Sequence, residues 1–267
     1  MLTSDVENFP GFPEAVIGPE LMERMRKQAE RFGPEIVYDD ASHVDLRTRP
    51  FKVEVGKNIH EGKAVIISTG ADAKWLGLPS ETRLRGHGVS SCATCDGYFF
   101  KQKDVVVVGG GDTAMEEATF LANITRKVTI IHRRDKLRAS QILQGRSLRN
   151  PKINFVWDSV VDEVLGDNNV TGVKSHNIKT GKEQTLKAEG VFIAIGHEPN
   201  TSLFKGQIDL DSKGYVITKK ETETNIPGVF AAGDVRDFRY RQAITAAADG
   251  CKAAIDADRF IGEHYKS

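Results

Sequence analysis

Two cysteines, Cys92 and Cys95, lie within the stretch formed by residues 90–97. The two small residues between them allow a compact disulfide, and a thiol in such a C-x-x-C setting commonly has its pKa lowered enough to react near neutral pH. Asp96 follows directly and could exchange a proton with the thiolate as the disulfide opens. Alternatively, Asp96 is a turn residue whose carboxylate accepts a local amide hydrogen bond. The stretch predicts a redox-active dithiol with a neighbouring acid.

Zinc binding is the other chemistry open to a C-x-x-C pair, and the number of available ligands disfavours it. A structural zinc site uses four ligands, usually with a second Cys or His pair at similar spacing. The only other cysteine is Cys251, and the seven histidines form no paired cluster. We therefore expect no metal site.

A nucleotide-binding fingerprint follows the cysteine pair. Residues 104–108 predict a strand, residues 109–114 fit the pattern G-x-G-x-x-A, and residues 115–122 predict a helix, which is the order that a dinucleotide-binding unit requires. The glycines permit the turn and a close backbone approach to a pyrophosphate, the alanine permits close helix packing, and the free amides of the helix bind phosphate. The predicted phosphate-binding residues are Gly109, Gly111, Asp112, Thr113 and Ala114.

The next predicted strand, residues 127–131, is followed by His132, Arg133 and Arg134, with Arg138 just beyond and a helix predicted over 136–148. In nucleotide-binding units of this kind, an acid near this position binds the ribose of NAD, whereas an arginine accommodates the 2′-phosphate of NADP. At about 1.5–3 kcal/mol for each charge-assisted bond, two arginines favour NADPH over NADH by roughly two to four powers of ten. A solvated basic helix start is the alternative. His132 could equally be a packed residue at the strand end.

Two apolar segments that flank this unit in sequence predict buried strands. They are residues 64–70, which end at Gly70, and residues 228–234, which end at Gly233 and Asp234. Asp234 could accept a hydrogen bond from a ligand hydroxyl, or it could be an ordinary turn aspartate. The two segments pair naturally into one domain split in sequence. Because nicotinamide donates a hydride and a disulfide accepts electrons through sulfur, we expect an intermediary between them, and a flavin is the usual one.

Two helices are predicted near the ends of the chain. Residues 20–32 form an amphipathic pattern with Leu21, Met25 and Phe32 on one face. The closing helix begins near Arg241-Gln242-Ala243, and its small residues predict a face that packs very closely. That face consists of Ala243, Ala247, Gly250, Cys251 and Ala254, so we expect Cys251 to be a buried, inert thiol.

The composition fits a soluble globular protein of 267 residues, with 39% hydrophobic and 28% charged residues and room for two modest domains. The 37 basic and 37 acidic residues cancel, which gives no reason to expect nucleic acid or an anionic membrane as a partner. No apolar run approaches the length of a membrane span. Three cysteines make no disulfide framework, so we expect a reducing compartment and a cytoplasmic location.

In combination, these motifs resemble the low-molecular-weight NADPH-dependent thioredoxin reductases, over nearly the whole chain. The resemblance rests on residues 92–97, 109–114, 132–135, 194–197, 229–234 and 241–243. It implies an α/β fold with two Rossmann-like dinucleotide-binding domains. Residues 74–197 would form the NADPH domain with the dithiol, and residues 1–73 and 198–267 would form an FAD domain split in sequence.

The resemblance implies a thioredoxin-disulfide reductase and a homodimer, with electrons passing from NADPH through FAD to Cys92 and Cys95 and on to thioredoxin. In that reading Cys95 faces the flavin, Cys92 exchanges with thioredoxin, and Asp96 is the proton donor. Tyr98 and Phe99 match positions that engage thioredoxin. His87 falls where many members have an arginine. The implied 2′-phosphate residues are Arg133, Arg134 and Arg138, beside His132. The implied FAD residues are Asn8, Gly70, Gly233, Asp234, Arg241, Gln242 and Ala243.

The sequence departs from the family at its front. Members begin with a strand and a G-x-G-x-x-G turn for the FAD pyrophosphate, whereas the only fingerprint here is the one at residues 109–114. We therefore expect an FAD domain that is N-terminally incomplete and a chain that binds FAD weakly. The competing interpretation is a non-catalytic NADPH-binding remnant, from a truncated product or an incomplete gene model.

Overall fold

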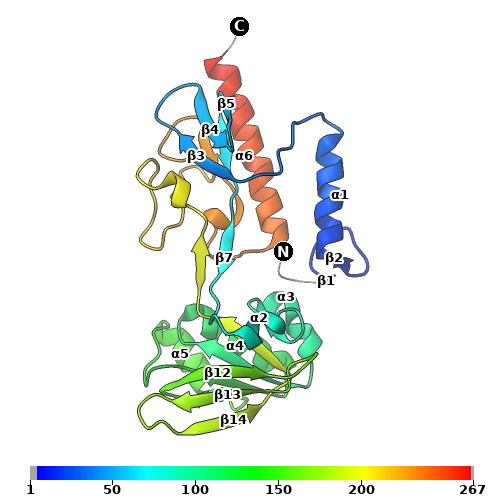
Figure 1. The fold of residues 1–267 in the computed structure, drawn as a ribbon, viewed down its shortest axis with the longest axis vertical. Coiled ribbons are helices and arrows are strands. Elements are labelled where there is room, and N and C mark those ends of the chain that lie inside the picture. Colours follow the sequence, from blue (N-terminus) through cyan, green and yellow to red (C-terminus); the bar gives the residue numbers. More distant parts are fainter. Residues whose placement is uncertain (1–4, 266–267) are drawn as a thin grey trace. The chain divides into compact units, whose positions relative to one another are not determined.

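The computed structural model describes residues 5–265, which fold into two compact units. Unit 1 comprises the chain up to residue 25 together with residues 73–196. Unit 2 comprises residues 26–72 and the chain from residue 197 onward. A two-stranded sheet of β7 (Ala71–Ala73) and β16 (His197–Pro199) lies where the chain passes between the units (Figure 1). The predicted α/β class is confirmed.

Unit 1 is built on a five-stranded parallel sheet of order β11-β10-β9-β15-β8. The strands are β8 (Val89–Ser90), β9 (Asp104–Gly109), β10 (Lys127–Ile131), β11 (Ile153–Val156) and β15 (Gly190–Ala194). Valines 105–108 on β9 are all buried, as expected for a parallel strand that is covered on both faces.

Each face of this sheet has its own cover. Val105 and Val107 pack in one core cluster with α4 (Asp112–Ile124), beside which lies α5 (Gln141–Leu148). Val106 and Val108 pack in the other cluster with a three-stranded antiparallel sheet (Figure 1). That sheet consists of β12 (Ser159–Leu165), β13 (Gly172–Asn177) and β14 (Glu183–Lys187). The alternation of valine side chains along β9 therefore joins the two layers.

The remaining elements of unit 1 are short, apart from the first helix. They are β1 (Asp5–Val6), β2 (Val16–Ile17), α1 (Gly18–Glu30, which runs on into unit 2), α2 (Pro79–Arg83), α3 (Ala93–Asp96) and the 3₁₀ turn η1 (Gly97–Phe100). Leu21 packs with Val6, Val16 and Met25, which confirms the predicted apolar face of α1. Phe32 was wrongly placed on that face, because the helix ends at Glu30 and Phe32 is 81% exposed.

Unit 2 combines an antiparallel sheet, a parallel strand pair and a long helix. The sheet contains β3 (Ala41–Asp45), β4 (Phe51–Val55) and β5 (Asn58–Gly62). The pair consists of β6 (Val65–Ile67) and β17 (Val229–Ala231), and the 3₁₀ turns are η2 (Ser202–Phe204) and η3 (Gly233–Val235). α6 (Ala243–His264) packs on β17 through Ala253, Ala257 and Phe260. The two apolar segments predicted to pair in one domain do so, through β6 and β17.

Two details of the helices differ from the sequence-based expectation. The helix predicted over 136–148 begins only at Gln141, because the backbone amides of Arg138 and Ser140 bond to the fingerprint turn instead. On α6, Cys251 is exposed, so the prediction of a buried thiol is wrong. The buried residues of α6 are Asp249, Ala253, Ala257 and Phe260, because this stripe and not the predicted small-residue face is turned toward the core.

Candidate active site

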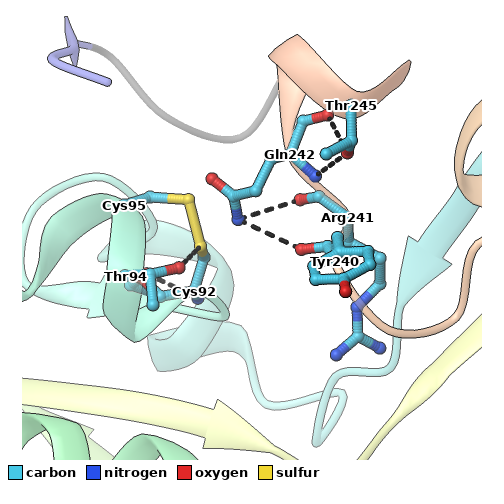
Figure 2. The surroundings of a disulfide bond; sticks show 8 residues. Cys92, Thr94, Cys95, Tyr240, Arg241, Gln242 and Thr245 are labelled. Carbon is cyan, nitrogen blue, oxygen red and sulfur yellow. Dashed lines mark hydrogen bonds between the residues drawn. A yellow bond between two sulfur atoms is a disulfide. The ribbon is translucent and has the colours of Figure 1, made fainter. Parts of the chain in front are cut away.

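Cys92 and Cys95 form a disulfide with an S–S distance of 2.09 Å (Figure 2). Cys92 caps α3 and Cys95 lies one turn further on, which brings their Cα atoms to 5.3 Å. The amide of Asp96 donates to the carbonyl of Cys92 at 3.1 Å, and the Thr94 hydroxyl lies 3.4 Å from the sulfur of Cys92. Both cysteines are half-buried. The short helix thus holds the pair in bonding position at the edge of the surface.

The dithiol turn is seated directly on α4, the helix that begins at the fingerprint. A Cβ atom added to Gly97 would lie 3.1 Å from side-chain atoms of Phe120, Leu121 and Ile124, so glycine allows this close contact. Ala93 is 1% exposed in the same cluster as Leu121. Unit 1 therefore holds the dithiol and the predicted phosphate-binding helix against each other.

A cavity of about 530 Å³ lies beside Asp96 in unit 1. Asp96 is half-buried, and the neighbouring aromatic residues Tyr98 and Phe99 are 61% and 44% exposed. Polar groups of the lining are His87, Ser90, Lys103, Asn169 and Glu189. The acid that follows the cysteine pair is thus next to a recess that is open to a small molecule or to a side chain of a partner.

The glycines of the fingerprint turn have different roles. Gly109 has φ +156°, and a Cβ there would lie 2.3 Å from the carbonyl oxygen of Ala194. A Cβ on Gly110 would lie 2.3 Å from the ring of His132, whereas one on Gly111 would meet nothing within 4 Å. The first two glycines therefore permit packing inside unit 1, and Gly111 leaves open space at the start of α4. No role for Gly110 was predicted from the sequence.

The loop that carries the arginines is tied to this turn. The carboxylate of Asp112 accepts from the amide of Ser140 at 2.7 Å, and the amide of Arg138 donates to the carbonyl of Gly110 at 2.7 Å. The side chains of Arg133, Arg134 and Arg138 are exposed and form no ion pair within residues 5–265. They are free to bind an anion beside the turn. Thr113 and Ala114 lie in the first turn of α4.

His132 is buried inside unit 1, with 4% of its surface exposed. Its Nε2 lies 3.0 Å from the carbonyl oxygen of Lys136, and its ring meets Trp157 edge-on. Burial lowers the pKa of His132, the hydrogen bond to the carbonyl of Lys136 opposes this, and the positive charges of the three arginines lower the pKa further.

The Gly-Asp turn of unit 2 contains an unsatisfied carboxylate oxygen. Oδ1 of Asp234 is buried and has no hydrogen-bond partner in the described part of the chain. Burial raises the pKa of Asp234 to about 6; Asp237 and Asp249 also raise it, while Arg241 opposes them. The amide of Gly233 donates to Asp249, which pairs with Arg236 at 2.6 Å. Asp249, a lone acid in an alanine-rich stretch, was not singled out from the sequence.

The segment before α6 holds the other predicted residues of unit 2. Nη1 of Arg241 donates to Nδ1 of His197 at 2.8 Å, and burial together with Arg241 lowers the pKa of His197 to about 4. Gln242 and Thr245 form reciprocal hydrogen bonds that cap the start of α6 at Ala243 (Figure 2). His197 was quoted in the sequence motif but was not predicted as a site residue.

Gly70 and Asn8 are the last two predicted site residues. Gly70 follows β6 with φ +73°, and its carbonyl accepts from the amide of Asn200. Asn8 lies in the exposed segment between β1 and β2 and belongs to unit 1.

No helix within residues 5–265 combines the length and apolar character needed to cross a membrane. In the same range, no three His, Cys, Asp or Glu side chains are grouped so that they could hold a metal ion.

Comparison with known proteins assigns the family. Residues 1–250 match the family described as pyridine nucleotide-disulphide oxidoreductase. The chain is 56% identical to a thioredoxin reductase of Streptomyces coelicolor, covering 98% of this chain and 82% of the relative. It is also 56% identical to a thioredoxin reductase of Rickettsia conorii, covering 98% of this chain and 86% of the relative.

Solved structures agree. A thioredoxin reductase from Giardia duodenalis matches with a TM-score of 0.93 and 44% identity, covering 98% of this chain and 86% of that structure. One from Streptococcus pyogenes matches with a TM-score of 0.91 and 42% identity, covering 98% and 85%. The chain is therefore an oxidoreductase of the pyridine nucleotide-disulphide class. Within that class it belongs to the thioredoxin reductase family, which confirms the resemblance and the Rossmann-like fold.

Proposed function

We propose that this chain reduces the disulfide of thioredoxin with electrons from NADPH, using FAD and the Cys92–Cys95 pair between them. The balanced reaction consumes NADPH, one proton and thioredoxin disulfide, and it yields NADP⁺ and thioredoxin dithiol. The observation that carries the proposal is the seating of the disulfide turn on α4, the helix that begins at the dinucleotide fingerprint. The names of the relatives at 56% identity support the same substrate.

The residues present fit NADPH. Gly111 leaves open space at the start of a 13-residue helix, whose first amides lack intrahelical acceptors and suit a pyrophosphate. The exposed arginines supply positive charge for a 2′-phosphate. The proposed NADPH residues are Gly109, Gly111, Asp112, Thr113, Ala114, His132, Arg133, Arg134 and Arg138, within a domain of residues 74–197.

The residues of unit 2 fit a flavin nucleotide. The buried, unpartnered Oδ1 of Asp234 suits a ligand hydroxyl as donor, because leaving such an atom unsatisfied costs free energy. From the family resemblance we also propose Gly70, Gly233, Arg241, Gln242 and Ala243, together with Asn8 from the segment between β1 and β2. These residues fall in the proposed FAD domain, residues 1–73 and 198–267. When bound, FAD accepts a hydride from a nicotinamide and delivers two electrons to a disulfide.

The reduced cysteine pair then acts as the thiol reductant. The thiolate of Cys92 attacks one sulfur of thioredoxin and forms a mixed disulfide, while the other thioredoxin sulfur leaves and takes up a proton. Cys95 attacks the sulfur of Cys92, which releases the second thioredoxin sulfur and closes the Cys92–Cys95 disulfide again. Asp96, half-buried beside the cavity, exchanges protons with the cysteine thiols.

The direct test uses the purified chain titrated with FAD and followed by visible absorbance. Anaerobic addition of NADPH should bleach the flavin absorbance, and NADPH consumption in turnover should then depend on oxidised thioredoxin. The Cys92→Ser/Cys95→Ser double variant should keep the bleaching and lose thioredoxin reduction. NADPH binding without flavin uptake, or turnover that is unchanged in the double variant, would contradict the proposal.

Three further assignments rest on the family resemblance. We propose a homodimer, a cytoplasmic location and thioredoxin docking at Tyr98 and Phe99, which are exposed beside the disulfide. The mass measured by light scattering during size-exclusion chromatography tests whether the chain is a dimer. Replacing both aromatic residues by alanine should raise the KM for thioredoxin and leave NADPH binding unchanged.

A further inference from the structure

His132 lies at the junction of the two halves of the proposed NADPH site. It follows β10 directly and precedes the loop of residues 133–140, which carries the three exposed arginines. The amide of His132 donates to the carbonyl of Val156, and its carbonyl accepts from the amide of Ser159, so the backbone is fixed on both sides. The side chain is turned inward, into the interior of unit 1.

The imidazole ring contacts the fingerprint turn from inside unit 1. A Cβ atom on Gly110 would lie 2.3 Å from Cε1 and 2.4 Å from Nδ1 of His132, a distance that no real Cβ contact reaches. The ring therefore occupies the space that a side chain at position 110 would need. The imidazole ring therefore determines how closely the glycine turn packs onto the interior of unit 1.

The same ring also holds the arginine loop. Its Nε2 lies 3.0 Å from the carbonyl oxygen of Lys136. A carbonyl only accepts hydrogen bonds, so the proton must be on Nε2. The amide of Arg138 donates to the carbonyl of Gly110 at 2.7 Å. The glycine turn and the arginine loop are therefore bonded to each other, and both contact the imidazole of His132.

The surroundings of the ring favour the neutral imidazole. His132 is buried, and the charged groups that act on it are Arg133, Arg134 and Arg138, all positive. Nδ1 lies against Gly110, and Trp157 meets the ring edge-on with 6.3 Å between the centroids. A second proton would add positive charge beside the arginines and would place it inside unit 1.

We propose that His132 is a positioning residue that sets the spacing between the pyrophosphate-binding turn and the arginine loop, and thereby the preference for NADPH over NADH. The inference rests on the proposed function, since it assumes that NADPH binds at this turn. The 2′-phosphate and the pyrophosphate are held at a fixed separation by one ribose. A ligand that has both groups gains from both subsites only if the protein presents them at the matching distance.

The test compares ligands that reach one subsite with a ligand that reaches both. NADH reaches the turn, 2′-AMP reaches the arginine loop, and NADPH reaches both. In His132→Leu, which keeps bulk and loses the Nε2 donor, NADPH should bind about tenfold more weakly, while NADH and 2′-AMP change by less than about twofold. His132→Gln, whose amide can restore the donor, should recover most of the NADPH affinity. His176→Leu, a histidine replacement on β13, should bind all three ligands as the wild type does.

The outcomes separate the inference from the proposed function. Equal weakening of all three ligands, or no weakening of any, overturns the positioning role. A wild-type chain that does not bind NADPH refutes the proposed function instead. If His132→Leu does not fold, His132→Gln carries the test by itself: NADPH should bind with close to wild-type affinity, and equal weakening of all three ligands overturns the inference.

Discussion

The two units hold their predicted binding groups in opposite ways. In unit 1, Arg133, Arg134 and Arg138 are exposed to water beside a turn whose first two glycines are closely packed. In unit 2, the unpartnered oxygen of Asp234 is buried, and the half-buried His197 is bonded to Arg241. A ligand of unit 1 meets solvated charges, whereas a ligand of unit 2 satisfies a group that folding has removed from water.

This difference separates two kinds of energetic coupling. Salt screens the binding of a ligand to exposed charges. Such binding stabilises the folded unit only through mass action. Binding to a buried, unsatisfied carboxylate relieves a penalty that the empty folded unit carries, so affinity and stability become linked there. We therefore expect ionic strength to act mainly on unit 1 and pH to act mainly on unit 2.

The largest effect is expected on thioredoxin turnover, from a cysteine replacement in unit 1 that leaves NADPH affinity unchanged. Cys95→Ser removes the disulfide and should lower thioredoxin turnover by at least about a thousandfold. NADPH affinity, measured by fluorescence titration, should stay within about twofold, because the arginines and the glycine turn are intact. Cys251→Ser is the matched control and should keep full turnover. Residual turnover above a few per cent would place the electron path elsewhere.

Removing arginine charge should produce the next largest effect. Arg133→Ala/Arg134→Ala should weaken NADPH binding about a hundredfold, from about 1.5 kcal/mol for each charge-assisted bond, and leave NADH unchanged. Added salt should weaken NADPH binding to the wild type much more than to this variant. Arg146→Ala, which removes an exposed arginine from α5, is the control. Equal loss of NADPH and NADH would contradict the 2′-phosphate assignment.

Asp234→Asn should separate binding from stability in unit 2. The folded-state pKa of Asp234, about 6, lies above its ordinary value of 3.8. The contribution of Asp234 to the free energy of unfolding is therefore fully present below pH 3.8 and is lost as the pH rises to 6. The raw cost of about 3 kcal/mol becomes about 1 kcal/mol after allowance for partial exposure. The variant should therefore gain about 1 kcal/mol in free energy of unfolding at pH 7–8 and almost nothing at pH 4.

The same variant should lose FAD affinity by about tenfold, because an amide replaces a charged acceptor. Denaturant titrations at pH 4 and pH 8 without flavin measure the first effect, and an FAD titration measures the second. A loss of stability at pH 8 would mean that the Asp234 oxygen is satisfied in solution.

His197 should produce the opposite pH dependence. Its pKa is lowered from 6.5 to about 4, so its contribution is fully present above pH 6.5 and is lost as the pH falls toward 4. After the same allowance for exposure, the loss amounts to about 1 kcal/mol. His197→Gln keeps an acceptor for Arg241 and should flatten the acid limb of a stability–pH curve. An unchanged acid limb would exclude His197 as its source.

The parts of the site that were predicted from the sequence depend on neighbours in the chain. The disulfide turn, the strand-turn-helix fingerprint and the position of the arginines after β10 all follow from local spacing. The contacts of His132 with Gly110, of His197 with Arg241 and of Asp249 with Arg236 join residues that the fold brings together. Local propensity also placed the start of α5 too early, because Arg138 and Ser140 bond to the fingerprint turn.

The smallest effect concerns α6, where the periodicity was ambiguous because small residues occur on every face. The packed stripe contains Ala253 and Ala257, and Cys251 lies outside it. Cys251→Ser should therefore change the free energy of unfolding by less than about 0.5 kcal/mol, whereas Ala253→Ser, with the same hydroxyl placed at 0% exposure, should cost about 1–3 kcal/mol. Thiol reagents should label Cys251 in the folded chain while the Cys92–Cys95 disulfide remains closed. Slow labelling of Cys251 until the chain unfolds would show that this face of α6 is covered in solution.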